Sequence, residues 1–78
     1  MISDEVWASV EMPAAVTNSF RYTDEELSAL ADALYEIGKQ QKTRLTKQDV
    51  ARLGLNVVLD DYRRRGPASL LGQLAGVE

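Results

Sequence analysis

Polar and apolar residues alternate over residues 17–22, TNSFRY, directly before the most clearly helical part of the chain. The alternation places three residues on each face: Asn18, Phe20 and Tyr22 on one, and Thr17, Ser19 and Arg21 on the other. A period of two is typical of a half-buried strand. The pattern therefore predicts a short strand. That strand needs a pairing partner, because even a two-stranded hairpin is marginal in water.

A first helix is predicted to begin at Thr23. Glu26 follows three residues later, which is the spacing of a capping box, and acidic residues fill the first turn. Apolar residues then recur at spacings of three and four: Leu27, Leu30, Ala31, Leu34 and Ile37. This is the apolar stripe of an amphipathic helix. We expect the helix to end between Gly38 and Lys42, where the chain becomes polar and basic.

A second helix is predicted from the N-cap Thr46, with Asp49 completing the cap, to a stop before Gly66-Pro67. Its apolar residues nearly encircle it: Val50, Ala51, Leu53, Leu55, Val57, Val58, Leu59 and Tyr62. A helix that is apolar most of the way round is buried most of the way round. The first helix alone cannot cover this surface, whereas a second chain can.

The two ends of the sequence are set apart from this pattern. Residues 1–15 lack sustained periodicity and are predicted to form a flexible arm carrying Trp7. Residues 66–78 form a tail in which three leucines at helical spacing favour a short helix. The domain proper is therefore expected at residues 16–65.

Composition favours an oligomer. The chain has 78 residues and neither cysteine nor histidine. A domain of this size is marginal alone, and disulfides, thiolate sites and histidine sites are excluded. We expect no cofactor and a two-fold homodimer, in which the strand pairs with its own copy. The expected dimer core consists of Phe20, Tyr22, Leu27, Leu30, Leu34, Val50, Leu53, Val57, Val58 and Tyr62.

Charge is divided along the chain although the net charge is only −3. Residues 1–37 carry eight acids and one base, whereas residues 38–65 carry eight bases and three acids. The division predicts a basic face on an acidic protein. No apolar run approaches the length of a membrane span, and the absence of cysteine fits a cytoplasmic protein.

The stretches SFRYTDEELSAL and RLTKQDVARLGLNVVLDDYRRRG, in this order, resemble the ribbon-helix-helix (MetJ/Arc/CopG-like) family of DNA-binding proteins over about residues 17–65. The resemblance implies a mainly α fold with one short N-terminal strand and two helices. Two copies would form an intertwined homodimer whose two-stranded antiparallel ribbon enters the major groove of double-stranded DNA. It further implies a transcriptional repressor, with autoregulation or plasmid maintenance as its setting.

The same resemblance assigns site residues. The outer face of the strand, Thr17, Ser19 and Arg21, would contact bases. The start of the second helix, Thr46, Lys47 and Gln48, would hold a phosphate through backbone amides. Arg44 adds positive charge beside this anchor and is included among the phosphate contacts. Because the ribbon carries few basic residues, DNA binding would rely on the turn before the second helix or on several dimers side by side.

Other interpretations stay open. The stretch TKQDVARLGLN also resembles a LacI-type helix-turn-helix, in which Gly54 would end one helix and NVVLDDYRR would form the recognition helix. Alternatively, the dimer is a protein-interaction module or an antitoxin or partition component, docking through the arm or the tail. An enzyme is not expected, because no nucleophile, phosphate loop or metal constellation is present and the carboxylate clusters fit helix surfaces and caps.

Overall fold

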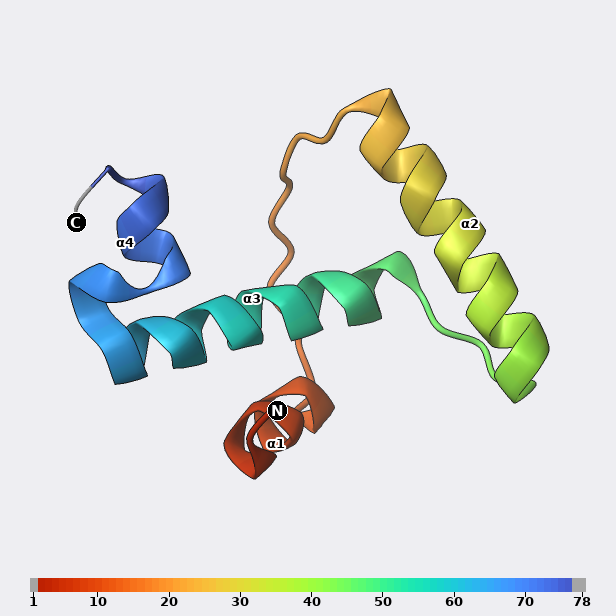
Figure 1. Ribbon diagram of the computed structural model, residues 1–78. Helices are drawn as coiled ribbons and strands as arrows, with labels where there is room; N and C mark the ends of the chain where they lie inside the picture. The colour runs from red at the N-terminus through yellow and green to blue at the C-terminus, as the bar shows by residue number, and fades with distance from the viewer. Residues whose placement is uncertain (1, 77–78) are drawn as a thin grey trace. The chain divides into compact units, whose positions relative to one another are not determined.

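The computed structural model describes residues 2–76. It is helical, and its elements are α1 (Asp4–Glu11), α2 (Asp24–Gln41), α3 (Lys47–Arg65), a 3-10 turn (Gly66–Ala68) and α4 (Leu70–Leu74) (Figure 1). The chain divides into two compact units. The central unit is Pro13–Val50, and the terminal unit combines the residues up to Met12 with those from Ala51 onward. Each unit is described by itself.

The predicted strand is wrong, and so is the ribbon-helix-helix fold that depended on it. Across residues 2–76 the structure contains four α-helices and no β-strand. Residues 17–22 lie between helices without regular structure, and their local hydrogen bond runs from the Ser19 amide to Asn18 Oδ1 at 3.0 Å. Alternation places polar and apolar side chains on opposite sides of an extended segment. A β-strand also needs a second extended backbone with which to form hydrogen bonds. Elsewhere the described chain is mostly helical, so residues 17–22 have no extended segment to pair with and no ribbon is formed.

Helix α2 confirms the prediction made from its capping box. The Thr23 hydroxyl accepts a hydrogen bond from the Glu26 amide at 3.1 Å, and the Glu26 carboxylate accepts one from the Thr23 amide at 2.8 Å. The Thr23 backbone amide, and then the Thr23 side chain, hold the pKa of Glu26 below its ordinary value, because donation from these groups favours the charged carboxylate. The helix ends at Gln41, inside the predicted interval.

Helix α3 also confirms its predicted bounds. It begins after Thr46 and ends at Arg65, immediately before the 3-10 turn that contains Pro67. Gly66 has a φ of 53°, a left-handed conformation that glycine adopts readily, and it ends the helix there. The helix continues without interruption through Gly54. The helix-turn-helix interpretation, which required a break at that glycine, is therefore wrong.

Short helices form in both terminal segments. Helix α1 lies in the stretch predicted as an arm; its N-cap Ser3 accepts from the Val6 amide, and acidic residues occupy its first turn. Helix α4 lies in the tail, where the fully buried N-cap Ser69 accepts from the Gly72 amide at 3.1 Å. Asp61 joins α3 to α4, because its carboxylate accepts from the Leu70 amide at 2.7 Å.

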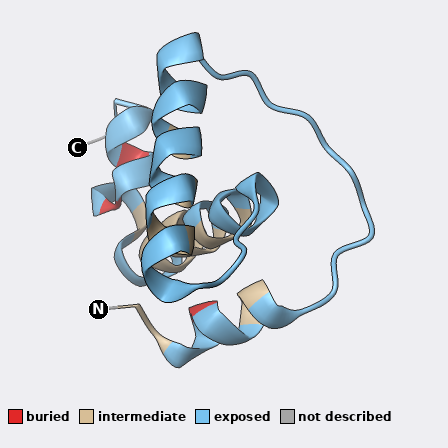
Figure 2. Cartoon of the chain, turned by 90° about the vertical axis from the view of Figure 1, so that its right-hand side faces the viewer, coloured by how far each residue is buried: buried red, intermediate tan, exposed pale blue. Residues whose placement is uncertain are grey.

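Burial is slight in both units (Figure 2). In the described part of the terminal unit, Val6 is the buried hydrophobic side chain, 4% exposed. In the central unit every residue is exposed or partly exposed. All ten residues expected in a dimer core have solvent access within the single chain, among them Phe20 at 65% and Tyr22 at 53%. A large apolar surface is left uncovered.

Candidate nucleic-acid interface

Four basic side chains surround the junction between α2 and α3 in the central unit. Lys39 lies in the last turn of α2, Lys42 and Arg44 lie in the connection, and Lys47 begins α3. We call these four residues the basic connection. All four are exposed, and none takes part in an ion pair within residues 2–76. The Lys39 ammonium lies 5.5 Å from the centre of the Tyr35 ring. The basic connection therefore presents to solvent four exposed positive charges that form no salt bridge among the described residues.

The turn after α2 places Lys42 in an unusual backbone conformation. Lys42 has φ 52° and ψ 41°, the left-handed region, and its amide donates to the Gly38 carbonyl. The Thr43 amide donates to the same carbonyl at 3.2 Å. A Cβ at Gly38 would lie 2.9 Å from the Thr43 carbonyl oxygen, so the close approach of the chain requires glycine there. The left-handed position itself carries lysine, at a cost of about 1–2 kcal/mol relative to ordinary backbone.

The start of α3 is closed by a reciprocal cap. The Thr46 hydroxyl accepts from the Asp49 amide at 3.2 Å and donates to the Asp49 carboxylate at 3.0 Å. The same carboxylate accepts from the Thr46 amide at 2.8 Å. The Thr46 hydroxyl, although exposed, is thus already hydrogen-bonded to Asp49. Lys47 and Gln48 contribute first-turn amides, which helix geometry leaves without a carbonyl partner inside the helix.

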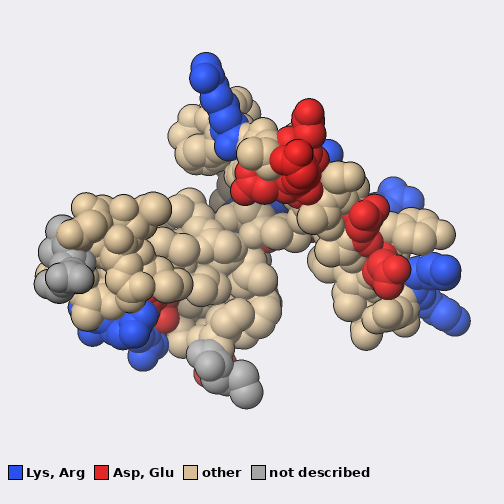
Figure 3. Space-filling model, turned by 45° about the horizontal axis from the view of Figure 1, so that its top comes forward, with Lys and Arg blue, Asp and Glu red and all other residues tan. Residues whose placement is uncertain are grey.

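Charge in α2 differs between its two ends, with Asp32 and Glu36 lying between them. Its first turn carries Asp24, Glu25 and Glu26, and its last turn carries Lys39, an arrangement that complements the helix dipole. Eighteen residues of α-helix span roughly 27 Å, several times the Debye length of about 8 Å at physiological salt. The acidic end therefore contributes little at the basic connection. In Figure 3 several Lys and Arg side chains extend outward from the face drawn.

The residues predicted to contact bases lie in the exposed segment before α2. Thr17, Ser19 and Arg21 are all exposed, and the segment has no regular secondary structure. No hydrogen bond in the described chain joins these three residues to the basic connection. The structure thus brings Arg44, Thr46, Lys47 and Gln48 together around one turn, and it leaves the predicted base contacts as a separate group in the same unit.

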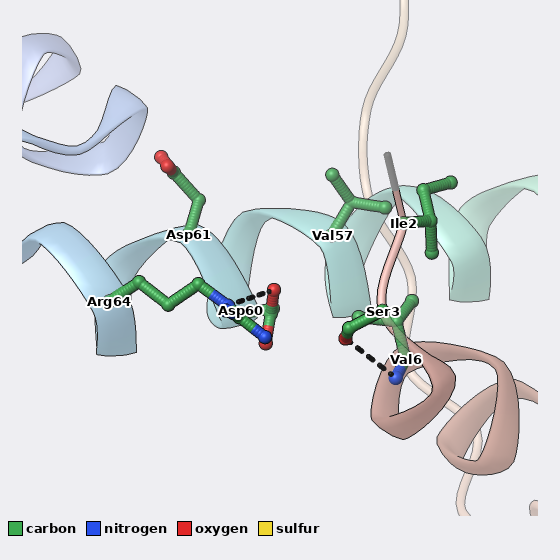
Figure 4. Close-up of a pocket in the computed structure, with 7 residues that line it drawn as sticks. All are labelled: Ile2, Ser3, Val6, Val57, Asp60, Asp61 and Arg64. Atoms are coloured by element: carbon green, nitrogen blue, oxygen red, sulfur yellow. Dashed lines mark hydrogen bonds and ion pairs between the residues drawn. The ribbon is translucent and has the colours of Figure 1, made fainter.

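The terminal unit contains a cavity of about 300 Å³ between α1 and α3 (Figure 4). It is lined by Ile2, Ser3, Val6, Val57, Asp60, Asp61 and Arg64. Its charged groups have partners, since Asp60 pairs with Arg64 at 2.9 Å and Asp61 pairs with Arg65 at 2.6 Å. In Figure 4 the Asp61 side chain points away from the Asp60–Arg64 pair.

Two electrostatic features complete the terminal unit. The Arg65 guanidinium, and then the Leu70 amide, hold the pKa of Asp61 below its ordinary value. No group of acidic, cysteine or histidine side chains arranged to hold a metal ion occurs among residues 2–76. The polar contacts of this cavity are therefore internal to the fold.

Arg52 is the residue of this chain whose role sequence reasoning missed. Its guanidinium donates to the carbonyls of Ser9, Val10 and Met12 at 2.8, 2.9 and 2.5 Å. No local signal indicates this contact, because a single basic residue inside an amphipathic helix ordinarily faces solvent. Lys42 falls within the basic stretch of residues 38–65, but its left-handed backbone has no sequence signal of its own.

Comparison with known proteins assigns no family. No protein-family model matches the chain, and no curated protein or solved structure matches it. Among the described residues, none of the helices combines the length and the apolar character that crossing a membrane would need.

Proposed function

We propose that this chain binds double-stranded DNA through the basic connection. The observation that carries the proposal is the left-handed Lys42, one of four exposed cations that form no salt bridge within residues 2–76. Backbone strain of this kind is retained where a function requires the residue. Lys42 meets this description, because glycine would relieve the strain but would remove the charge.

Binding would be mainly electrostatic. Each Lys or Arg that meets a phosphate releases condensed counterions, so four cations supply an affinity that depends steeply on salt. The first-turn amides of Lys47 and Gln48 add hydrogen-bond donors for a phosphate oxygen. Thr17, Ser19 and Arg21 are the candidates for base contacts, with Arg21 able to take a guanine through two donors.

The proposed form is a homodimer. The chain leaves large apolar side chains uncovered in both units, including Phe20, Leu55 and Tyr62 at 65%, 55% and 49% exposure. A chain of 78 residues without disulfides gains stability most readily by burying such surface against a second copy. The proposed role is transcriptional repression in the cytoplasm, which needs DNA binding but no catalysis.

The proposal is tested by titrating the dimeric protein into a duplex of about 25 base pairs from upstream of its own coding region, at several salt concentrations. Replacing Lys42, Arg44 and Lys47 together by alanine should weaken binding at least tenfold and reduce the salt slope by about three. Arg63→Ala is the control, because it removes one exposed charge from the opposite end of α3. Equal binding by the triple variant and the parent protein would contradict the proposal and favour a protein-interaction module.

Dimer formation is tested separately. Sedimentation should give a dimer at micromolar concentration, and the thermal midpoint should rise with protein concentration. A monomer with a concentration-independent midpoint would contradict the homodimer while leaving the DNA measurement valid.

A further inference from the structure

The attachment of α1 to α3 depends heavily on Arg52. Its guanidinium donates to three carbonyls, those of Ser9, Val10 and Met12, which form the C-terminal end of α1. The last carbonyls of a helix have no partner within it and form the negative end of the helix dipole. Helix α1 has no basic residue in its own last turn. Arg52, more than 40 residues away in the sequence, acts as its C-terminal cap.

The remainder of the contact is slight. Val6 is the buried hydrophobic side chain of α1, and Trp7 remains 47% exposed. At the start of α1, the cavity of about 300 Å³ separates Ile2, Ser3 and Val6 from the facing residues of α3 (Figure 4). Interiors that hold elements firmly are close-packed, and this contact is not. Helix α1 is therefore secured by Arg52 at its C-terminal end and by the single buried side chain of Val6, beside the cavity, near its beginning.

Helix α1 is itself acidic, and Arg52 lies near the start of α3. Helix α1 carries Asp4, Glu5 and Glu11 and no base. Glu11 immediately precedes Met12, whose carbonyl is bound by Arg52. On α3, Arg52 follows Gln48 by one helical turn and so lies on the same face. When α1 is docked, the hydrogen-bonding fork of Arg52 is occupied by the carbonyls of Ser9, Val10 and Met12.

We propose that α1 is an autoinhibitory latch on DNA binding. Phosphate oxygens bind the same guanidinium fork that the three carbonyls occupy, with the added strength of an opposite charge. Release of α1 frees Arg52 to contact a phosphate. Residues 13–22, which contain no helix or strand, keep the released helix tethered. The inference rests on the proposed DNA binding and adds its regulation.

Trp7 makes the latch directly observable. It is the sole tryptophan of the sequence, and it lies on α1. Its emission and anisotropy therefore report whether α1 is docked, independently of any DNA measurement. The probe is a random-sequence duplex of about 25 base pairs, which isolates the phosphate contacts.

Three variants separate docking from charge. Arg52→Lys keeps the charge but cannot hold three carbonyls, because an ammonium lacks the planar fork. Val6→Ser weakens the other anchor and leaves Arg52 intact. Both should increase the mobility of Trp7 and tighten DNA binding about threefold or more, with a salt slope more negative by about one. Arg52→Ala should also release Trp7, but its salt slope should stay at the value of the parent protein.

The outcomes distinguish the latch from the proposed function. If Arg52→Lys and Val6→Ser release Trp7 and DNA affinity stays unchanged, the latch is wrong and DNA binding through the basic connection stands. If neither variant changes Trp7, Arg52 does not hold α1 and the latch is also wrong. If the triple variant of the basic connection binds DNA as the parent protein does, the proposed function itself fails, whatever Trp7 shows.

Discussion

Inside each of the two units of this chain, a different kind of contact holds the residues together. In the terminal unit, Arg52 bonds to α1 across more than 40 residues, and Asp61 bonds to α4 across nine. In the central unit, the side-chain hydrogen bonds that the structure shows join residues no more than three apart, as in the Thr23–Glu26 and Thr46–Asp49 caps. The terminal unit has a few buried positions, and the central unit has none.

This difference in contacts distinguishes residues that the fold requires from residues that a function would require. A side chain that joins two elements, such as Arg52, is fixed by the fold. The cations of the basic connection form no salt bridge among the described residues and link no two helices, so the fold does not require lysine or arginine there. Their presence around a strained Lys42 is what indicates a binding surface. The predictions below test whether the two units respond to substitution as differently as their contacts differ.

The largest effect is expected from Gly72→Ala in the terminal unit. A Cβ at this position would lie 2.1 Å from the Pro67 carbonyl oxygen, a backbone atom that cannot move aside easily. We expect about 2–3 kcal/mol of destabilisation, confined to α4 and its junction with α3. Hydrogen exchange should show lost protection at Gly72 and Gln73, while α2 is unchanged.

Gly54→Ala is the matched control for that substitution. Nothing lies within 4 Å of a Cβ at Gly54, which sits in the interior of α3. Alanine there should stabilise the helix by about 1 kcal/mol, because glycine is a poor helix former. Equal destabilisation by both substitutions would contradict the close packing of α4 against the 3-10 turn.

Thr23→Ala should have the next largest effect, and it falls in the central unit. The substitution removes the hydroxyl that accepts the Glu26 amide and so opens half of the capping box. We expect a loss of about 1 kcal/mol in the stability of α2. Far-ultraviolet circular dichroism should show less helix, whereas Trp7 fluorescence, which reports the terminal unit, should not change. Serine at this position should retain most of the stability.

These two regions also explain how much of the structure could be predicted. The bounds of α2 and α3 follow from signals within a few residues, such as Thr23 with Glu26 and Gly66 before Pro67, and they were predicted from the sequence. The contact of Arg52 with Ser9 has no local signal, because nothing in either neighbourhood specifies a partner 43 residues away. The strand prediction failed for a related reason: alternation is local, whereas strand pairing is not.

The candidate interface was also predictable from the sequence only in part. Charge can be counted from the sequence, so the cluster of Arg44 and Lys47 was predicted. Whether Thr46 offers its hydroxyl to a ligand depends on its cap, and the structure engages that hydroxyl with Asp49. The left-handed backbone of Lys42 was not predictable, because lysine rarely adopts it and sequence rules place glycine or asparagine there.

Lys42→Gly should have a smaller effect of opposite sign. Glycine relieves the left-handed strain but increases the freedom of the unfolded chain, so we expect a net stabilisation of roughly 0.5 kcal/mol. The same substitution removes a cation from the basic connection and should weaken DNA binding. Lys42→Ala keeps the strain and removes the charge, so it should weaken binding equally without stabilising α2. A Lys42→Gly variant that was less stable than the parent protein would contradict the backbone argument.

The smallest effect is expected from acidification in the terminal unit. The pKa of Asp61 is held below its ordinary value of 3.8 by Arg65 and the Leu70 amide, so folding binds fewer protons here than the unfolded chain does. The contribution of Asp61 to the free energy of unfolding is therefore complete above pH 3.8 and is lost as the pH falls through the lower pKa of the folded state. The effect is small because the carboxylate is accessible to solvent and its ion pair is screened. The protection of the Leu70 amide, measured relative to the exchange rate of an unfolded peptide at the same pH, should fall in this acidic range, and Asp61→Asn should abolish that fall. Asp60→Asn is the control, since Asp60 pairs with Arg64 and has no bond to α4; if it had the same effect on Leu70, the tether would belong to the acidic pair as a whole and not to Asp61.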